Sequence, residues 1–250
     1  MTTVAHLSDP HLTTGPGDAA AARALQAAVD AVLGLQPAPD ALLLTGDVAE
    51  HGAPAEYARA REALAPLPMP LHVLPGNLDD RDAMRAAFGL PGTDGERIRY
   101  CVRCGTLRVV ACDTLIPGRD DGCLDDEHRA WLDAELAAEP RTPTIVAMHH
   151  PPIDIGISAF DEIGIPATDR AALGALLDRH GHVRRIVAGH VHRTVFGVLG
   201  PCGVVTAPST HLRSALEIGG HMIRLAPGIA GFALHVDIGG EIATHVEPLG

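Results

Sequence analysis

The chain has 250 residues, of which 31 are acidic and 19 basic, and its formal net charge is −12. Every basic residue is arginine, and the sequence contains no lysine. This charge argues against general binding to nucleic acids or anionic membranes, because both require a cationic protein surface. The content of 46% hydrophobic and 20% charged residues is typical of a globular protein and excludes a disordered one. The 15 histidines require an explanation, since histidine is the commonest metal ligand and acid–base group near neutral pH.

The cysteine content indicates a reducing environment. Five cysteines cannot all form internal disulfides. Cys101 and Cys104 make one C-x-x-C pair, but it lies between strand-like runs and no second pair stands at zinc-finger spacing, so we expect reduced, structural thiols. The N-terminal residues lack the basic and apolar regions of a signal peptide, and no apolar stretch is long enough to span a membrane. We therefore expect a cytoplasmic protein.

The first half of the chain alternates short apolar runs with helical segments. The apolar runs are predicted to be buried strands, because they are short, continuous and bounded by turn residues. Strands are expected at 4–7, 41–45 and 71–74, and helices at 19–36, 54–64 and 80–88.

The second half begins with a predicted hairpin around Gly105 and ends in strands separated by turns rich in Gly and Pro. Strands are expected at 98–102, 107–111, 144–148, 185–188, 195–199, 203–206, 221–225, 231–236 and 241–246, helices at 125–138 and 169–180, and a long loop at 151–166. This order predicts a single α/β domain over residues 1–250, in which about 211–250 form a strand-rich C-terminal extension.

Side chains that commonly bind metals follow five of the predicted strands. In open α/β sheets, ligands bind at the carboxyl ends of strands, so we expect these side chains to meet in one cleft. Each motif alone arises often by chance, whereas five of them at strand ends are hard to credit to chance. The motifs are Asp9-Pro10-His11, Gly46-Asp47, Gly76-Asn77, His149-His150 and Gly189-His190-Val191-His192.

The donor set predicts two metal ions. Two carboxylates, four imidazoles and one carboxamide offer mixed oxygen and nitrogen donors, which suit Mn, Fe, Zn or Co better than Ca or Mg. Seven side chains are too many for one tetrahedral site, but they fit two metals that share a bridging carboxylate. Asp47 is the expected bridge, because it follows a buried strand and Gly46 lets the backbone approach closely.

The order of these motifs resembles the calcineurin-like metallophosphoesterase superfamily, over residues 4 to about 210. The opening Leu7-Ser8-Asp9-Pro10-His11-Leu12 and the His149-His150-Pro151-Pro152 sequence are similar to its class III branch of cyclic-nucleotide phosphodiesterases and glycerophosphodiesterases. The resemblance implies a four-layer αββα sandwich with a dimetal site at the carboxyl ends of the strands, and a homodimer or larger homo-oligomer. It implies that one metal is bound by Asp9, His11, Asp47 and His192, and the other by Asp47, Asn77, His149 and His190.

The implied activity is hydrolysis of a phosphodiester bond in a small organic phosphate, of the cyclic-nucleotide or glycerophosphodiester class, by a hydroxide that bridges the metals. Two alternatives stay open: a phosphomonoesterase or phosphonate-ester hydrolase with the same site, and a weakly active scaffold that binds metal. The expected partner is a small-molecule phosphate ester. A nucleic-acid polymer is not expected, because the sequence shows no Arg-rich stripe that would hold its backbone, and neither is a membrane.

The third motif departs from the family pattern, because it reads Gly76-Asn77-Leu78-Asp79 where the family usually has Gly-Asn-His-Asp or Gly-Asn-His-Glu. The family His contacts the phosphate and is proposed to protonate the leaving group, and the Asp supports that His. Leu78 can do neither, and the loss of one positioned acid typically costs about 10²–10⁴-fold in rate. Three explanations are open: an engineered substitution, a natural one with another group or water as the acid, and a degenerate, weakly active member.

The candidate catalytic residues are therefore Asn77, the Leu78 position and Asp79, and the candidate substrate contacts are Asn77, His150 and His211. For His150 the alternative is a residue held by the turn that follows it, and for His211 it is a solvated loop residue. The loop 153–165 is apolar, which favours a lid over the site or a contact between subunits.

Overall fold

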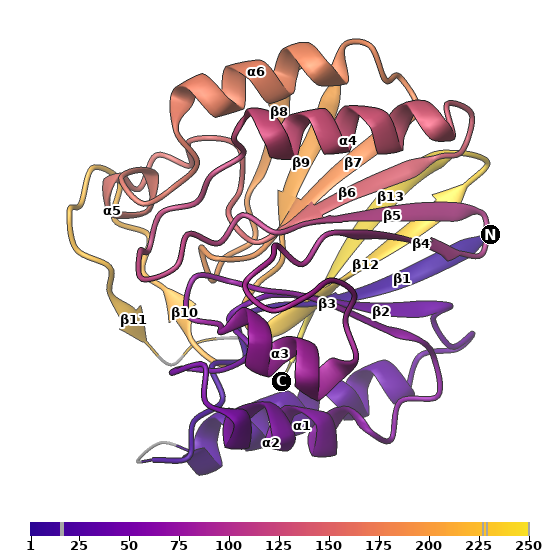
Figure 1. The fold of residues 1–250 in the computed structure, drawn as a ribbon. Coiled ribbons are helices and arrows are strands. Elements are labelled where there is room, and N and C mark those ends of the chain that lie inside the picture. Colours follow the sequence, from indigo (N-terminus) through magenta and orange to yellow (C-terminus); the bar gives the residue numbers. More distant parts are fainter. Residues whose placement is uncertain (16–17, 227, 229, 250) are drawn as a thin grey trace.

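Two β-sheets face each other in the computed structural model, which describes residues 1–15, 18–226, 228 and 230–249 (Figure 1). The first sheet has the order β13 (Glu241–Pro248), β12 (Gly231–Ile238), β1 (Thr2–Leu7), β2 (Ala41–Thr45) and β3 (Leu71–Leu74). The second has the order β4 (Tyr100–Cys104), β5 (Leu107–Cys112), β6 (Thr144–Met148), β7 (Val183–Ala188), β9 (Cys202–Thr206) and β8 (Phe196–Leu199).

The outer face of each sheet is covered by helices (Figure 1). One apolar cluster joins the first sheet to α1 (Asp18–Leu33), α2 (Pro54–Leu64) and α3 (Arg81–Phe88). A second joins the second sheet to α4 (Asp126–Ala138) and α6 (Ala167–Leu177). A third cluster fills the space between the two sheets. The α/β class predicted from the sequence is confirmed.

The central strands are apolar on both faces because both faces are buried. In β1, Val4 belongs to the cluster between the sheets, whereas Ala5 and Leu7 pack under the helices. Parallel pairing joins β1 to β2 and β2 to β3, and likewise β5 to β6, β6 to β7 and β7 to β9. The carboxyl ends of these strands therefore lie on one edge of each sheet, where the candidate ligands follow.

Three features of the fold differ from the sequence-based expectations. The predicted loop 151–166 contains a short helix, α5 (Ser158–Asp161), whose Phe160 is buried. The predicted strand 221–225 is wrong: only Leu225 is in a strand, β11 (Leu225–Ala226), which pairs with β10 (Arg213–Ser214). The apolar side chains of residues 221–225 are exposed, so this segment does not pack against a hydrophobic core. At the C-terminus, β12 lies between β13 and β1, so these strands are built into the first sheet.

Candidate metal centre

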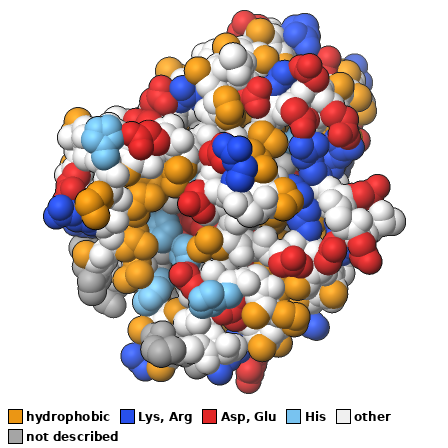
Figure 2. All heavy atoms as spheres, turned by 60° about the vertical axis from the view of Figure 1, so that its left-hand side comes forward, with side chains coloured by type: hydrophobic (Ala, Val, Ile, Leu, Met, Phe, Trp, Pro, Cys, Tyr) orange, Lys and Arg blue, Asp and Glu red, His pale blue; other side chains and the backbone are white. Residues whose placement is uncertain are grey.

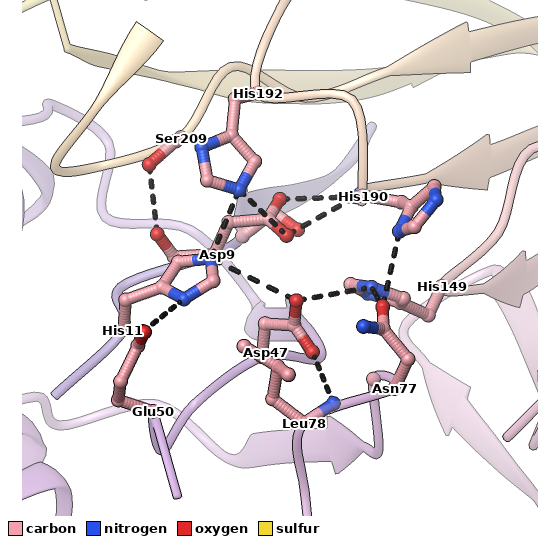
Figure 3. Close-up of polar contacts among 12 residues, drawn as sticks. Asp9, His11, Asp47, Glu50, Asn77, Leu78, His149, His190, His192 and Ser209 are labelled. Carbon is pink, nitrogen blue, oxygen red and sulfur yellow. Dashed lines mark hydrogen bonds and ion pairs between the residues drawn. The ribbon is translucent and has the colours of Figure 1, made fainter. Parts of the chain in front are cut away.

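The loops that follow β1, β2, β3, β6 and β7 bring the predicted ligands together (Figure 3). Histidine side chains lie in a hollow of the molecular surface, with hydrophobic side chains on one rim (Figure 2). Three overlapping groups of side chains have ligand atoms within 4.8 Å of one another. Two of these groups contain only predicted ligands, and the third adds His150. The groups are Asp9, His11 and His192; Asp9, Asp47 and His149; and His149, His150 and His190.

One half of the centre is formed by Asp9, His11 and His192. The Nε2 atoms of the two imidazoles are 2.9 Å apart. The Oδ1 atom of Asp9 lies 3.7 Å from the Nε2 atom of His192, and the Oδ2 atom of Asp47 lies 3.7 Å from the Nε2 atom of His11. These four side chains are the set that the resemblance implies for one metal.

The other half is formed around the side-chain amide of Asn77. Its Oδ1 atom is 3.1 Å from the Nε2 atom of His149 and 3.1 Å from the Nδ1 atom of His190. The Oδ2 atom of Asp47 lies 3.5 Å from the Nε2 atom of His149. The same oxygen of Asp47 is therefore close to both halves, which is the position that a bridging ligand requires.

Hydrogen bonds behind the imidazoles fix which nitrogen faces the centre. The Nδ1 atom of His149 donates to the carbonyl oxygen of Thr45 at 2.7 Å, and that of His192 donates to the carbonyl of Leu212 at 2.8 Å. The Nδ1 atom of His11 lies 2.8 Å from a carboxylate oxygen of Glu50. In all three rings Nε2 is thereby directed inward, as in metal sites whose ligands are oriented by a carboxylate or carbonyl.

Glu50 holds a candidate ligand, His11, and the sequence analysis did not identify it. It follows Asp47 by three residues, and no motif marks it. Pairing between Leu12 and Ala49 brings its backbone beside that of His11. This contact exists only after β1 and β2 have paired.

The backbone at the centre is strained. Asp9, His11, Asp47, His190 and His192 all have positive φ angles, between 46° and 70°, and no other non-glycine residue of the described chain does. Such conformations cost free energy in residues with a β-carbon and collect at functional sites, where the surrounding structure enforces them. Five of the seven predicted ligands thus have backbone conformations that the surrounding loops must enforce.

Glycines let the ligand loops approach one another. A β-carbon on Gly76 would lie 2.2 Å from Oδ1 of Asp47, and one on Gly189 would lie 2.0 Å from Oγ of Ser8 and 2.9 Å from Oδ2 of Asp9. Gly46 has a φ of +90° and equally close neighbours. Each of these glycines precedes a ligand directly, so the motif glycines are a packing requirement of the centre.

The charges of the centre fit metal cations. Asp9 and Asp47 are buried, and their ion-pair partners in the described part of the chain are imidazoles. Burial acts to raise the pKa of Asp47, but His149 and His11 outweigh it and lower that pKa. Burial lowers the pKa of His190 and of His192, which keeps both rings neutral and able to bind a metal. The Nε2 atom of His190 is buried without a hydrogen-bond partner. Burial acts to lower the pKa of His149 and of His11, but Asp47 and Glu50 outweigh it and raise both, that of His149 to about 9. The buried carboxylates therefore favour positive charge at this place, which metal cations would supply instead of protons.

Leu78 donates its backbone N–H to Oδ1 of Asp47 at 3.0 Å. The next residue, Asp79, is buried and accepts hydrogen bonds from the backbone N–H groups of Val48, Ala49 and Gly76. It also accepts one from the Tyr57 hydroxyl at 3.0 Å. Asp79 therefore joins the loop after β2 to the loop after β3, and this arrangement does not require a histidine at position 78.

His150 and His211, the two candidate substrate contacts beside Asn77, have different surroundings. His150 is fully buried, its Nδ1 atom lies 2.8 Å from Oγ1 of Thr114, and its Nε2 atom lies 3.0 Å from the carbonyl of Asp120. Both ring nitrogens are engaged, which fits a residue held by its loop better than a substrate contact. His211 is half-buried, and burial together with the nearby charge of His11 lowers the pKa of its ring, so it lies at the border of the centre.

The apolar loop after His150 packs against the molecule itself. Ile157 and Phe160 are buried with Val191, and the Phe160 ring meets the ring of His190 edge-on at 5.7 Å. This packing makes the loop a support for His190, and its role as a lid over the site or as a contact between subunits stays a prediction.

The five cysteines are unpaired. Cys101 packs in the cluster under α4, whereas Cys104 lies in the cluster between the sheets, so the C-x-x-C pair points to opposite faces of β4. In the part of the chain that the structure describes, no helix has the length and hydropathy needed to cross a membrane.

Comparison with known proteins finds relatives that are phosphoesterases. The family model of calcineurin-like phosphoesterases matches residues 2–194. The glycerophosphodiester phosphodiesterase GpdQ of Enterobacter lignolyticus is 33% identical over 217 residues, which cover 83% of this chain and 77% of that protein. The 3',5'-cyclic adenosine monophosphate phosphodiesterase CpdA of Pseudomonas aeruginosa is 33% identical over 247 residues, which cover 96% of this chain and 88% of that protein.

A solved structure shows the same fold at low sequence identity. The purple acid phosphatase PPD1 of yellow lupin has a TM-score of 0.64 at 16% identity, covering 94% of this chain and 49% of that one. With the family match and the two relatives at 33% identity, these findings show that the chain belongs to the calcineurin-like phosphoesterases, a family of hydrolases with a dimetal centre.

Proposed function

We propose that this chain hydrolyses phosphodiester bonds in small organic phosphates of the cyclic-nucleotide or glycerophosphodiester class. The observation that carries the proposal is the convergence of seven oxygen and nitrogen donors on one hollow, in two halves that share Asp47. Two relatives with these substrate classes in their names, each covering most of the chain, support the same conclusion.

Asp9, His11 and His192 would hold one metal, Asn77, His149 and His190 the other, and Asp47 both. When bound, two such metals supply positive charge that activates water and stabilises the charge on phosphoryl oxygens. Mn, Fe, Zn and Co suit this donor set.

Asn77 has a second task in this proposal. Its Oδ1 atom is directed at His149 and His190, so its Nδ2 group remains as a hydrogen-bond donor on the other side of the amide. We assign this N–H to a phosphoryl oxygen of the substrate. The His211 ring, at the border of the centre, is the second substrate contact that we propose.

Leu78 limits which diesters the site can hydrolyse rapidly. Its side chain cannot give a proton to the departing alcohol, and its backbone N–H is occupied by Asp47. The alcohol must then leave as an anion or take its proton from water. We expect diesters with good leaving groups, such as nitrophenolates, to react much faster than those of simple alcohols.

The test combines metal analysis with a substrate panel. We expect about two metal ions per chain, and with Mn²⁺ present a faster reaction with bis(4-nitrophenyl) phosphate than with 4-nitrophenyl phosphate. Asp47→Asn should lose at least one metal and at least about 100-fold in rate, because one carboxylate serves both halves. Asp94→Asn, at an exposed acid, is the matched control and should change neither.

The proposal fails if no phosphate ester is hydrolysed above background by the metal-loaded chain or by its Leu78→His variant. A faster reaction with the monoester would replace the diester assignment with a phosphomonoesterase.

The cellular setting that we propose is the cytoplasm, because all five cysteines are unpaired.

Self-association also remains a prediction. Leu216, Ile218 and Met222, which are 62%, 71% and 70% exposed, support it, because adjacent exposed apolar side chains favour an interface.

A further inference from the structure

A second hollow leads away from the metal centre, on the side of Asn77. The first part has a volume of about 260 Å³ and is lined by Asn77, by the acidic residues Asp79, Asp80 and Asp82, and by residues of other segments. It shares Arg81, Gly95, Leu115 and Pro117 with a larger cavity of about 500 Å³. The two are therefore one cleft, which begins at a candidate metal ligand and ends in what we call the arginine pocket.

The arginine pocket is lined by Arg81, Arg97 and Arg99, three of the 19 basic residues of an acidic chain. Glu96 and Glu127 also line it. Blue and red side chains gather to the right of the histidine hollow in Figure 2. Such a concentration of guanidinium groups is the usual means of holding phosphates and carboxylates, because their N–H groups match two oxygens at once.

Carboxylates account for only part of the hydrogen-bonding capacity of these arginines. Arg81 makes a buried two-point contact with Asp113. Arg97 donates to Asp125 at 2.5 Å and to Glu127 at 3.4 Å, and Arg99 donates to Glu127 at 2.7 Å. The side chains of Arg97 and Arg99 keep 23% and 27% of their surface exposed. A guanidinium has five N–H donors, so donors remain at both residues.

Buried polar atoms without a partner concentrate here. Eight such side-chain atoms occur in the described chain, and four of them belong to Arg97, Arg99 and His128. They are Nε of Arg97, Nη1 of Arg99 and both ring nitrogens of His128. Buried polar groups are nearly always hydrogen-bonded in native proteins, and exceptions indicate a bound water or ion. Arg97 and Arg99 line the pocket and His128 lies behind them, so a ligand there would meet the exposed N–H groups of the two guanidiniums.

We propose that the arginine pocket binds an oxyanion, a phosphate or a carboxylate, at the far end of the cleft that starts at Asn77. The anion is bound by Arg97 and Arg99, while Arg81, fixed by Asp113, lines both parts of the cleft. Two sources can supply it: the second end of an extended phosphodiester substrate, or a free anion. Only the first source rests on the proposed function.

The single tryptophan of the chain reports on this pocket. Trp131 lies under Arg99, whose guanidinium carbon is 5.4 Å from the ring centroid, and its ring is 5.6 Å from that of His128. We expect inorganic phosphate to change Trp131 fluorescence with saturation, and sodium chloride of equal ionic strength to do so much less. Arg97→Gln should weaken this binding at least 10-fold, and Arg97→Lys less.

Two controls separate the pocket from other effects. Arg103→Gln removes an exposed arginine of the nearby strand β4, whose partner is Glu139, and should leave the titration unchanged. Asp47→Asn should also leave the fluorescence titration unchanged. This control excludes phosphate bound at the metal centre as the source of the signal. Circular dichroism checks that each variant is folded. No saturable response, or equal affinity in folded Arg97→Gln, would overturn the proposal.

The source of the anion is decided with the metal-loaded enzyme. Two 4-nitrophenyl diesters are compared, one of glycerol and one of glyceric acid, which differ by one carboxylate. If Arg97→Gln raises KM for the glycerate diester at least 5-fold and leaves the glycerol diester unchanged, the anion belongs to the substrate. If phosphate binds but the two diesters respond alike, the site takes a free anion.

Discussion

The close approach of Gly76 to Asp47 makes Gly76→Ala the sharpest probe of the metal centre. The added methyl carbon would lie 2.2 Å from Oδ1 of Asp47 and 2.4 Å from its backbone nitrogen. Real contacts of a β-carbon are not shorter than 3.0 Å, so the carboxylate and its loop must move by roughly 0.8 Å. Gly76 does not have a positive φ, so the alanine backbone itself is unstrained and the effect is steric. Displacements of about 1 Å at a reacting centre cost about 100-fold in rate.

The assay measures kcat for bis(4-nitrophenyl) phosphate and the number of metal ions per chain, with thermal unfolding to confirm the fold. We expect a loss of about 100-fold in kcat for Gly76→Ala, with partial loss of metal. Gly181→Ala is the matched control, because a β-carbon there meets nothing within 4 Å. If Gly76→Ala binds two metals and keeps the full kcat, the reasoning is refuted, because the position of the Asp47 carboxylate would then not matter for the reaction.

The remaining predictions concern proton transfer and buried histidines. Leu78→His should raise turnover on diesters of simple alcohols by about 10²-fold or more and on nitrophenyl diesters far less, because only the former need an acid; equal effects would disprove the leaving-group role. For His128, burial and the neighbouring Arg97 and Arg99 lower the pKa to about 3. Above pH 6.5 the ring is neutral in both states. Between pH 6.5 and about pH 3, only the unfolded chain takes up the proton. The free energy of unfolding therefore decreases as the pH is lowered through this range. Urea unfolding at pH 7.5 and 5.5 should show about 1.4 kcal/mol less pH dependence in His128→Leu; an unchanged dependence would mean that His128 is protonated in the fold.

Many features of the protein were readable from short stretches of sequence. Strands such as Ala41–Thr45 and Thr144–Met148 were predicted with the bounds that the structure gives them, because a continuous apolar run between turn residues is a local signal. The motifs at strand ends were local too, and parallel strands bring their carboxyl ends to one edge whatever the details of packing. The residue types within the motifs indicated the metal chemistry.

The tertiary structure decided everything that depends on contacts between distant segments. No pattern marked Glu50 as the partner of His11, or the full burial of His150 between Thr114 and Asp120. The positive φ angles of the ligands arise because neighbouring loops hold them, not because their sequence prefers them.

The arginine pocket shows the same division. Its arginines come from α3 and from the segment before β4, and their acidic partners come from the start of α4 and from the loop after β5. Each residue looks like ordinary surface charge in the sequence. Only the packing of α3 and α4 around one end of the sheets places them in a common cavity. The sequence by itself determined which residues carry the metal chemistry, since that information is local. The structure alone decided how they are oriented and what lies beside them, because both depend on long-range packing.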